Sequence, residues 1–250
     1  LIYDGTAIVD VTDPANIQVL DYLGTGSASI SLCAAGNLLF QSDWQYGLVI
    51  WDITDPTDVQ FMQTIQQVIA ASGSYDAYSL GYTVACYVDG NKAYVVDANG
   101  AVFIVSITSD TTYTVDSYYV TDGRPWDVVV QNGIAYVLDE FEGLIALNVA
   151  NPAAPKLVSA ATISGMDWSN LAVAGTLAVL STSTGFQFVD VSDPAHMVVQ
   201  YNFDSPTWGT QAAINAGLAA LPMSSGAGVV LMDVSELQYD TYFKGSKKFT

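Results

Sequence analysis

The sequence predicts an all-β protein in which one small antiparallel sheet is repeated six times within a single domain, residues 1–250. Three observations lead to this prediction. A short apolar run recurs at a nearly constant spacing, Gly or Asn stands at the same place in most copies, and no segment has the periodicity of a long amphipathic helix.

A glycine precedes each apolar run and anchors the repeat. The six anchors are Gly5, Gly47, Gly100, Gly143, Gly185 and Gly228. Neighbouring anchors lie 42 or 43 residues apart, except that the interval from Gly47 to Gly100 is 53 residues. The runs are rich in Val and Ile, which favours strands. Three runs end in Asp-Pro, where proline removes a backbone donor and Asp binds its local backbone, so each strand stops there.

Four elements follow one another in each unit, and the fourth unit shows them most clearly. We predict strands at 126–131, 134–139, 144–149 and 156–163. Asn132-Gly133 joins the first two, because Gly and Asn supply the positive φ that a tight hairpin needs. Four strands in about 42 residues are typical of a propeller blade, whereas solenoids of similar period are helical. The prediction is therefore a six-bladed β-propeller of four-stranded antiparallel blades.

The two ends of the chain are expected to complete the first blade. The chain starts at Leu1, where the second strand of a blade begins, and unit six should end with a strand at 237–243. Gly245-Ser246 aligns with Gly26-Ser27, the start of an inner strand. We therefore expect 246–250 to pair beside the Leu1 strand and close the ring, which removes an unpaired edge. The alternatives are that an upstream segment supplies this strand, or that the tail completes the blade of a neighbouring subunit.

The repeat resembles a known family. Leu48-Val49-Ile50-Trp51-Asp52 nearly spells the signature of the LVIVD-repeat β-propellers, and 7–14 and 186–194 carry the same pattern. This resemblance covers essentially the whole chain and implies the propeller fold. It also implies a secreted or surface-attached protein, mostly without a defined activity among the family members. Units three and six depart from the Asp-Pro ending, which puts those two turns in doubt.

The charge composition excludes some partners. Only 12% of the residues are charged, and 25 acids against 6 bases give a net charge of −19. Such a field repels phosphate backbones, so we expect no nucleic-acid partner. No uninterrupted apolar stretch is long enough to span a membrane, so no transmembrane segment is predicted. The single histidine, His196, rules out a Ser-His triad, and no motif indicates a cofactor.

Aromatic and acidic residues at the starts of the inner strands form a candidate ligand site. The set comprises Arg124, Trp126, Asp127, Asp167, Trp168 and Trp208. Aromatic faces beside carboxylates suit a sugar or an organic cation, and a carboxylate pair could also perform acid–base chemistry on a sugar. The other interpretation is that the tryptophans fill the space between blades.

A row of aspartates ends the second strands of four consecutive units, at Asp4, Asp43, Asp97 and Asp139. Four carboxylates around a ring could hold a cation. The interpretation that we favour is that each aspartate caps the tight turn that follows it. We therefore predict no metal site.

Two further features indicate contacts with other protein subunits. The strand 112–120 should be an exposed outer edge, and its Tyr113, Tyr118 and Tyr119 would suit such a contact. The tail carries Lys244, Lys247 and Lys248, half of all basic residues. We therefore expect a non-enzymatic extracellular or cell-surface structural or interaction protein that self-assembles into a homo-oligomer or filament. The alternative is a small-ligand or carbohydrate-binding propeller.

The two cysteines, Cys33 and Cys86, fall on the inner strands of neighbouring units. Counted from their turn glycines, they lie on opposite faces of their sheets, and opposite faces of neighbouring blades meet. A disulfide is therefore one interpretation. Free buried thiols are the one that we favour, because Cys is a common small core residue.

Overall fold

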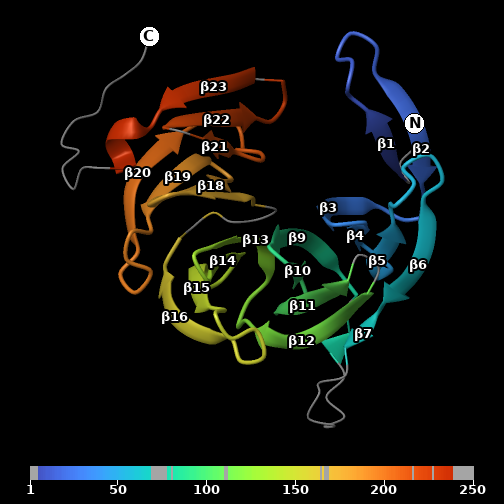
Figure 1. Cartoon of the computed structure of the whole chain (residues 1–250). Helices are drawn as coiled ribbons and strands as arrows, with labels where there is room; N and C mark the ends of the chain where they lie inside the picture. Colours follow the sequence, from blue (N-terminus) through green and yellow to red (C-terminus); the bar gives the residue numbers. More distant parts are fainter. Residues whose placement is uncertain are drawn as a thin grey trace.

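The computed structural model describes residues 5–68, 78–79, 81–109, 112–163, 165, 169–215, 217–226 and 228–238. This part of the chain is all-β and its sheets are antiparallel, with one short 3₁₀ helix, η1 (Ser235–Gln238), and no α-helix among the described residues. Figure 1 shows six sheets following one another in chain order along an arc around a common centre.

We number the sheets 1 to 6 in chain order. Sheet 1 is β1 (Thr6–Asp10) and β2 (Gln18–Leu23). Sheet 2 is β3 (Ser29–Ala35), β4 (Leu38–Asp43), β5 (Gly47–Asp52) and β6 (Gln60–Ile65). Sheet 3 is β9 (Thr83–Asp89), β10 (Lys92–Asp97), β11 (Ala101–Ser109) and β12 (Thr112–Val120).

Sheet 4 is β13 (Pro125–Gln131), β14 (Ile134–Asp139), β15 (Gly143–Asn148) and β16 (Lys156–Ala161). Sheet 5 is β17 (Leu171–Ala174), β18 (Leu177–Thr182), β19 (Gly185–Asp190) and β20 (Val198–Asp204). Sheet 6 is β21 (Ala213–Asn215), β22 (Leu218–Met223) and β23 (Gly228–Asp233). A separate ladder of β7 (Gln67–Val68) and β8 (Tyr78–Ser79) lies in the long interval between units two and three.

The turns form for the reasons that the sequence indicated. Gly133 and Asn132 have φ of 75° and 54° in the hairpin between β13 and β14. In the Asp-Pro turns, the Asp55 Oδ1 accepts hydrogen bonds from the Thr57 N–H at 2.9 Å and the Thr57 hydroxyl at 2.7 Å. The Asp55 carboxylate thereby satisfies hydrogen-bond donors of the turn that have no partner on a neighbouring strand, and the strand ends there.

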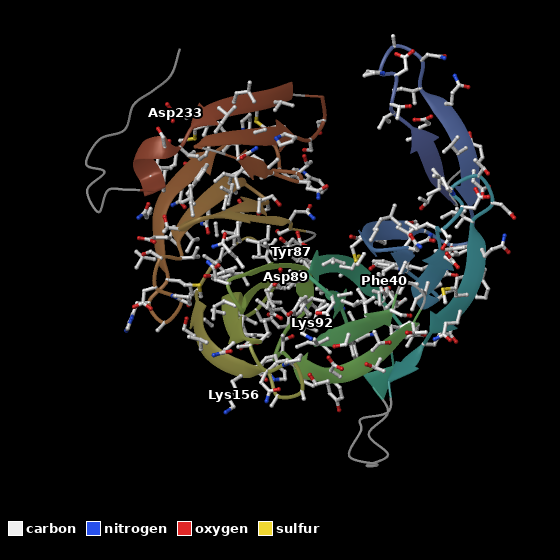
Figure 2. All side chains as sticks on the ribbon, viewed as in Figure 1. Phe40, Tyr87, Asp89, Lys92, Lys156 and Asp233 are labelled. Carbon is white, nitrogen blue, oxygen red and sulfur yellow. A yellow bond between two sulfur atoms is a disulfide. The ribbon has the colours of Figure 1, made fainter. Side chains whose placement is uncertain are left out.

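The core consists of layers of side chains between consecutive sheets, and Figure 2 shows these side chains between neighbouring ribbons. We call the face of a sheet that is turned toward the next sheet in chain order its forward face, and the opposite face its back face. In β15, Leu144 and Ala146 pack forward against sheet 5, whereas Ile145 and Leu147 pack back against sheet 3. This alternation follows from the period of two along a strand. The same arrangement gives five apolar layers, one between each pair of consecutive sheets from sheet 1 to sheet 6.

The end of unit six differs from its prediction. Instead of a strand beginning at Leu237, residues 235–238 form η1. Unit six has Glu236-Leu237 where units one, two and five have Asp-Pro. The Asp233 Oδ1 accepts hydrogen bonds from the backbone N–H and hydroxyl of Ser235, as Asp52 does from Thr54 in unit two. Leu237 is then buried in the layer between sheets 5 and 6. Both the rest of this predicted strand and the closing tail, 246–250, lie outside the described residues.

Candidate functional site

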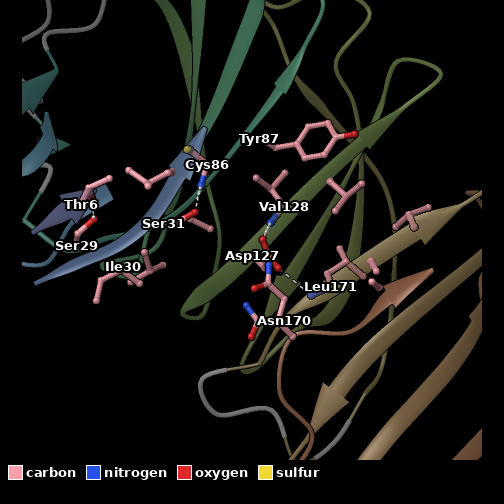
Figure 3. Close-up of a pocket in the computed structure, with 18 of the residues that line it drawn as sticks. Thr6, Ser29, Ile30, Ser31, Cys86, Tyr87, Asp127, Val128, Asn170 and Leu171 are labelled. Carbon is pink, nitrogen blue, oxygen red and sulfur yellow. Dashed lines mark hydrogen bonds between the residues drawn. The ribbon is translucent and has the colours of Figure 1, made fainter. Parts of the chain in front are cut away.

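The inner strands of sheets 2 to 6 and the edge of β1 surround a central cavity of about 860 Å³. The inner strands are β3, β9, β13, β17 and β21, each the first strand of its sheet. Sheet 1 contains only its two outer strands among the described residues, so Gly5, Thr6 and Ala7 of β1 reach the cavity directly. Figure 3 shows Thr6 and Ser29 on one side of the cavity and Asp127 and Asn170 on the other.

Asp127 ties two sheets together at the cavity wall. Its Oδ1 accepts a hydrogen bond from the Val128 N–H at 2.8 Å, and its Oδ2 accepts one from the Leu171 N–H, also at 2.8 Å. The first bond lies within β13, and the second reaches β17 of the next sheet. Desolvation raises the pKa of Asp127 to about 6, although these backbone bonds and the Asn170 side chain act in the opposite direction.

Trp126 points away from the cavity, because consecutive side chains in β13 lie on opposite faces. It is buried in the layer between sheets 3 and 4, where it packs with Val84, Val96 and Ile104. This is the arrangement that the packing interpretation predicts. The structure therefore separates Trp126 from Asp127, which the candidate ligand site had grouped together.

The other members of that predicted set do not converge on the cavity in the described structure. Arg124 is exposed, and the one ion pair within the described ranges joins His196 Nδ1 to Asp193 Oδ2 at 2.7 Å. Trp208 is exposed and does not line the cavity. Asp167 and Trp168 lie outside the described residues.

The aspartates at the ends of the second strands serve the turns. Asp43, Asp97 and Asp139 are fully buried. The Asp43 Oδ1 accepts hydrogen bonds from the N–H groups of Gln45 and Tyr46, both at 2.9 Å, and Asp139 binds its own turn in the same way. Within the described ranges no group of three or more His, Cys, Asp or Glu side chains is arranged to hold a metal ion. Asp4 lies outside those ranges.

The tyrosines predicted for subunit contacts lie on β12, which is the outer strand of sheet 3. Tyr113 and Tyr118 are half-buried against the layer between sheets 2 and 3, and Tyr119 against the layer between sheets 3 and 4. The Tyr118 ring lies 5.7 Å from that of Phe103, centroid to centroid. Lys244, Lys247 and Lys248 lie outside the described residues.

Cys33 and Cys86 form a disulfide, so the preference for free thiols was wrong. Their Cα atoms are 5.7 Å apart, across the boundary between β3 and β9. The two inner strands come this close because neighbouring sheets converge toward the centre of the arc, as Figure 1 shows. The count from the turn glycines correctly placed the cysteines on facing surfaces, but spacing along the chain does not give the distance between two sheets.

Several polar residues of the cavity wall were missed by the sequence interpretation. Thr6, Ser31, Asn170 and Gln211 line the cavity together with Asp127. Ser31, Asn170 and Gln211 lie on or beside the first strand of their sheets, which is the strand nearest the centre of the arc. Thr6 lies on β1, the described strand of sheet 1 that reaches the cavity. The signal that could have found them is the innermost position in each unit, combined with the alternation of side chains along a strand.

Comparison with known proteins agrees with this geometry. A family model, described as the LVIVD repeat, matches residues 26–66, 122–162 and 167–205. The chain belongs to the LVIVD-repeat family. The first LVIVD match spans β3 to β6, the second β13 to β16 and the third β17 to β20, so each matched LVIVD repeat is one four-stranded sheet.

Solved structures share the fold of this LVIVD-repeat chain at low sequence identity. A functionally unknown protein from Desulfotomaculum acetoxidans is 12% identical with a TM-score of 0.69, and the match covers 94% of this chain and 77% of that one. Sqt1 of Saccharomyces cerevisiae is 9% identical with a TM-score of 0.62, covering 92% and 77%. The computationally designed Ika8 protein is 13% identical with a TM-score of 0.57, covering 87% and 74%. No match was found among curated proteins.

No helix in the part of the chain that the structure describes has the length and apolar character needed to cross a membrane.

Proposed function

We propose that the chain is a six-bladed β-propeller that works as a non-enzymatic structural or interaction protein outside the cell or on its surface. In this proposal the propeller is one domain over 1–250, its first blade is closed by the C-terminal segment, and it assembles with further copies of itself. The support comes from the strand count, the open surfaces at the ends of the arc, and the outer rim.

The strand count supports six blades. Four sheets have four strands, sheet 6 has three and sheet 1 has two. The three strands needed to complete the ring equal the number that the sequence predicts near 1–4, 237–243 and 246–250, although residues 237–238 of the second segment lie in η1. Six four-stranded blades are therefore compatible with the strands that the structure describes.

The space beside β1 suits a closing strand. Ile30 and Leu32 lie on the back face of β3 and are exposed toward the place where the inner strands of sheet 1 would stand. Gly5, just before β1, and Thr6 and Ala7 of β1 line the cavity, and among the described residues no strand pairs with this edge of β1. An edge of this kind beside an exposed apolar wall is a site where a strand adds favourably.

The two ends of the arc carry matching apolar faces. Val229 and Leu231 on the forward face of β23 are 59% and 67% exposed, whereas their equivalents in β19, Phe186 and Phe188, are fully buried. On the back face of sheet 1, Val11 is 61% exposed. Of its equivalents elsewhere, Ile53 is half-buried and four are buried, namely Ile107, Val149, Val191 and Val234.

These faces are the two that no described sheet covers, and each would meet the other in a closed ring. Five apolar layers already lie between consecutive sheets, and in a closed ring a sixth layer of the same kind would lie between sheet 6 and sheet 1. We call this proposed layer the seam. Burying such side chains is favourable by about 25 cal/mol per Å² of apolar surface.

The interaction function rests on one observation, the apolar rim. Val19, Phe61 and Leu157 stand at equivalent positions on three outer strands, each paired with a back-facing residue of the adjacent strand. All three are exposed. A repeated apolar position around the outside of a protein is typical of a surface that contacts other proteins. The disulfide fits an oxidising, extracellular setting.

Light scattering coupled to size exclusion, with negative-stain imaging, tests the proposed assembly. We expect the full-length protein to form oligomers or filaments, and F61S combined with L157S to shift it toward the monomer. The control is F141S, because Phe141 is exposed in a turn outside the rim. A wild-type protein that stays monomeric at every concentration would rule out assembly.

Deletion of 244–250 tests the closure. If the tail closes its own ring, the deletion lowers the melting temperature and leaves the protein monomeric at dilutions where the wild type is monomeric. An unchanged melting temperature contradicts closure by the tail. A melting temperature that depends on protein concentration in the wild type but not in the deletion variant indicates that the tail completes a neighbouring subunit instead.

A further inference from the structure

The wall of the central cavity has an uneven distribution of charge. Among the described residues that line it, Asp127 is the single carboxylate and there is no basic side chain. The remaining polar groups are hydroxyls and amides, including those of Ser31, Asn170 and Gln211. The chain as a whole has a net charge of −19. Within the described part of the wall, an anion would meet a negative field and no basic partner.

The Asp127 carboxylate retains unused acceptor capacity. Each of its oxygens accepts one backbone hydrogen bond, at 2.8 Å, and the Asn170 side chain supplies a further hydrogen bond, whereas a carboxylate offers about four acceptor sites. Figure 3 shows Asp127 beside Asn170, on the wall away from β1. This side of the cavity is separate from the space beside β1 that the closing strand would take.

The carboxylate is half-buried at the cavity wall. Burial disfavours its charged form, and a desolvated charge gains most from a partner of opposite sign that also donates hydrogen bonds. An ammonium group meets both conditions, since it is positive and has several donors.

Other ligand classes fit this wall less well. A divalent metal ion requires several oxygen ligands with more than one negative charge, and one carboxylate lines the cavity among the described residues. A sugar requires an aromatic platform, and Trp126, the tryptophan next to Asp127, is buried between sheets 3 and 4. The volume, about 860 Å³, lies within the range of small-molecule sites.

We propose that the central cavity is a binding site for a small organic ammonium ion, with the ammonium group held by the Asp127 carboxylate and the neighbouring Asn170 side chain. This site differs from the one predicted from the sequence, because it uses Asp127 without any tryptophan. It is also independent of the proposed assembly, which concerns the outer surface of the molecule.

Three aromatic probes of similar size and different charge test the proposal by isothermal titration calorimetry at pH 7.5. They are benzylammonium, benzyl alcohol and benzoate. Methylammonium is a fourth probe and serves as a smaller cation. We expect saturable binding of an ammonium probe. The alcohol should bind weaker by about tenfold or more, because it lacks the positive charge that strengthens the hydrogen bond to Asp127. Benzoate should not bind, because the Asp127 carboxylate repels its negative charge.

The variant D127N should weaken ammonium binding by about tenfold or more. The matched control is D21N. Asp21 is also half-buried, its Oδ1 accepts the N–H of the next residue, Tyr22, and its Oδ2 accepts the N–H of Val59 in the next sheet. D21N therefore removes the same charge and the same kind of inter-sheet bond, but outside the cavity, and should bind like the wild type.

The pH dependence gives a second measurement. Affinity should fall as the pH drops through about 6, because the Asp127 carboxyl then takes up a proton. Tyr87 on β9 is the other titratable side chain of the cavity wall, since Cys86 is in the disulfide. The proposal is overturned if neither ammonium probe binds, if D127N binds as well as the wild type, or if D21N loses binding to the same extent.

Discussion

Asp127 combines two opposing effects in one side chain. Its carboxylate joins sheets 4 and 5 by accepting a hydrogen bond from each, yet burial raises its pKa from 3.8 to about 6. The bonds favour the charged form and desolvation disfavours it, and desolvation is the larger effect. The side chain therefore positions two inner strands while making the stability of the folded state depend on pH.

The first prediction concerns this sensitivity. Between about pH 4 and pH 6 the folded state holds a proton on Asp127 that the unfolded state has released. The contribution of this group to the free energy of unfolding is therefore largest at acidic pH and is lost as the pH rises through this window. We expect D127N to remove that part of the pH slope.

Urea unfolding at several values between pH 4 and 7 measures the slope in the wild type and in D127N, with D21N as the control. The difference between variants is the relevant quantity, because burial also raises the pKa of Asp97, which adds a slope of the same sign in every variant. Identical slopes in the wild type and D127N would contradict the assignment.

The second prediction concerns an anchor glycine. Gly185 has φ of 130°, and a Cβ there would lie 2.0 Å from the backbone oxygen of Phe203 on the neighbouring strand. We expect G185A to lower the free energy of unfolding by roughly 1–3 kcal/mol, because the backbone must shift and the new side chain has an unfavourable φ.

G90A is the comparison for G185A. Gly90 has φ of 59° and open space around it, so its variant suffers the unfavourable φ without a collision. Chemical denaturation should rank G185A as clearly less stable than G90A. Equal stability of the two variants would show that the close approach of the Phe203 carbonyl has no energetic effect.

At the scale of elements, strands and turns follow local chemistry. The strand 134–139 was predicted and is observed as β14, because alternation and the Asn132-Gly133 turn are properties of neighbouring residues. Unit six shows the limit of this approach. Its 3₁₀ helix replaces a predicted strand where Glu236-Leu237 stands at the position of Asp-Pro in units one, two and five.

The third prediction concerns the disulfide, which joins elements of two sheets. Cys33 and Cys86 are 53 residues apart, and closing a loop of this length stabilises the fold by about 4 kcal/mol through the unfolded chain. We expect the double variant C33S/C86S to lose roughly 2–4 kcal/mol of unfolding free energy in denaturant titrations.

Reduction of the wild type provides the control, since it should reproduce the effect of the double variant and add the mass of two hydrogens. A wild-type mass that does not change on reduction would show that the bond is absent in the purified protein. Unfolding midpoints that agree between the wild type and C33S/C86S would contradict the stabilising role.

At the scale of the whole molecule, closure of the ring depends on the seam between sheet 6 and sheet 1. The fourth prediction compares two valines on strands, Val229 at the proposed seam and Val198 on an outer strand, which are 59% and 57% exposed. If the seam closes in solution, V229A loses a buried contact and costs roughly 2 kcal/mol. V198A should stay within about 0.5 kcal/mol of the wild type, as a surface substitution does.

Thermal and urea unfolding at low protein concentration measures both variants without interference from assembly. Equal, small effects of V229A and V198A would show that the seam stays open. A large effect that appears only at high protein concentration would show that the face of sheet 6 is covered by a second copy.

The sequence by itself determined the all-β class, the repeated unit, the turns and the family, because each depends on residues close together in the chain. Periodicity also gave which residues share a face, as it did for the two cysteines. The tertiary structure decided which faces meet and how closely. It bonded Cys33 to Cys86, buried Trp126 between two sheets and left Asp127 on the cavity wall. The physical reason is that packing distances and desolvation depend on strands far apart in the chain, about which local spacing carries no information.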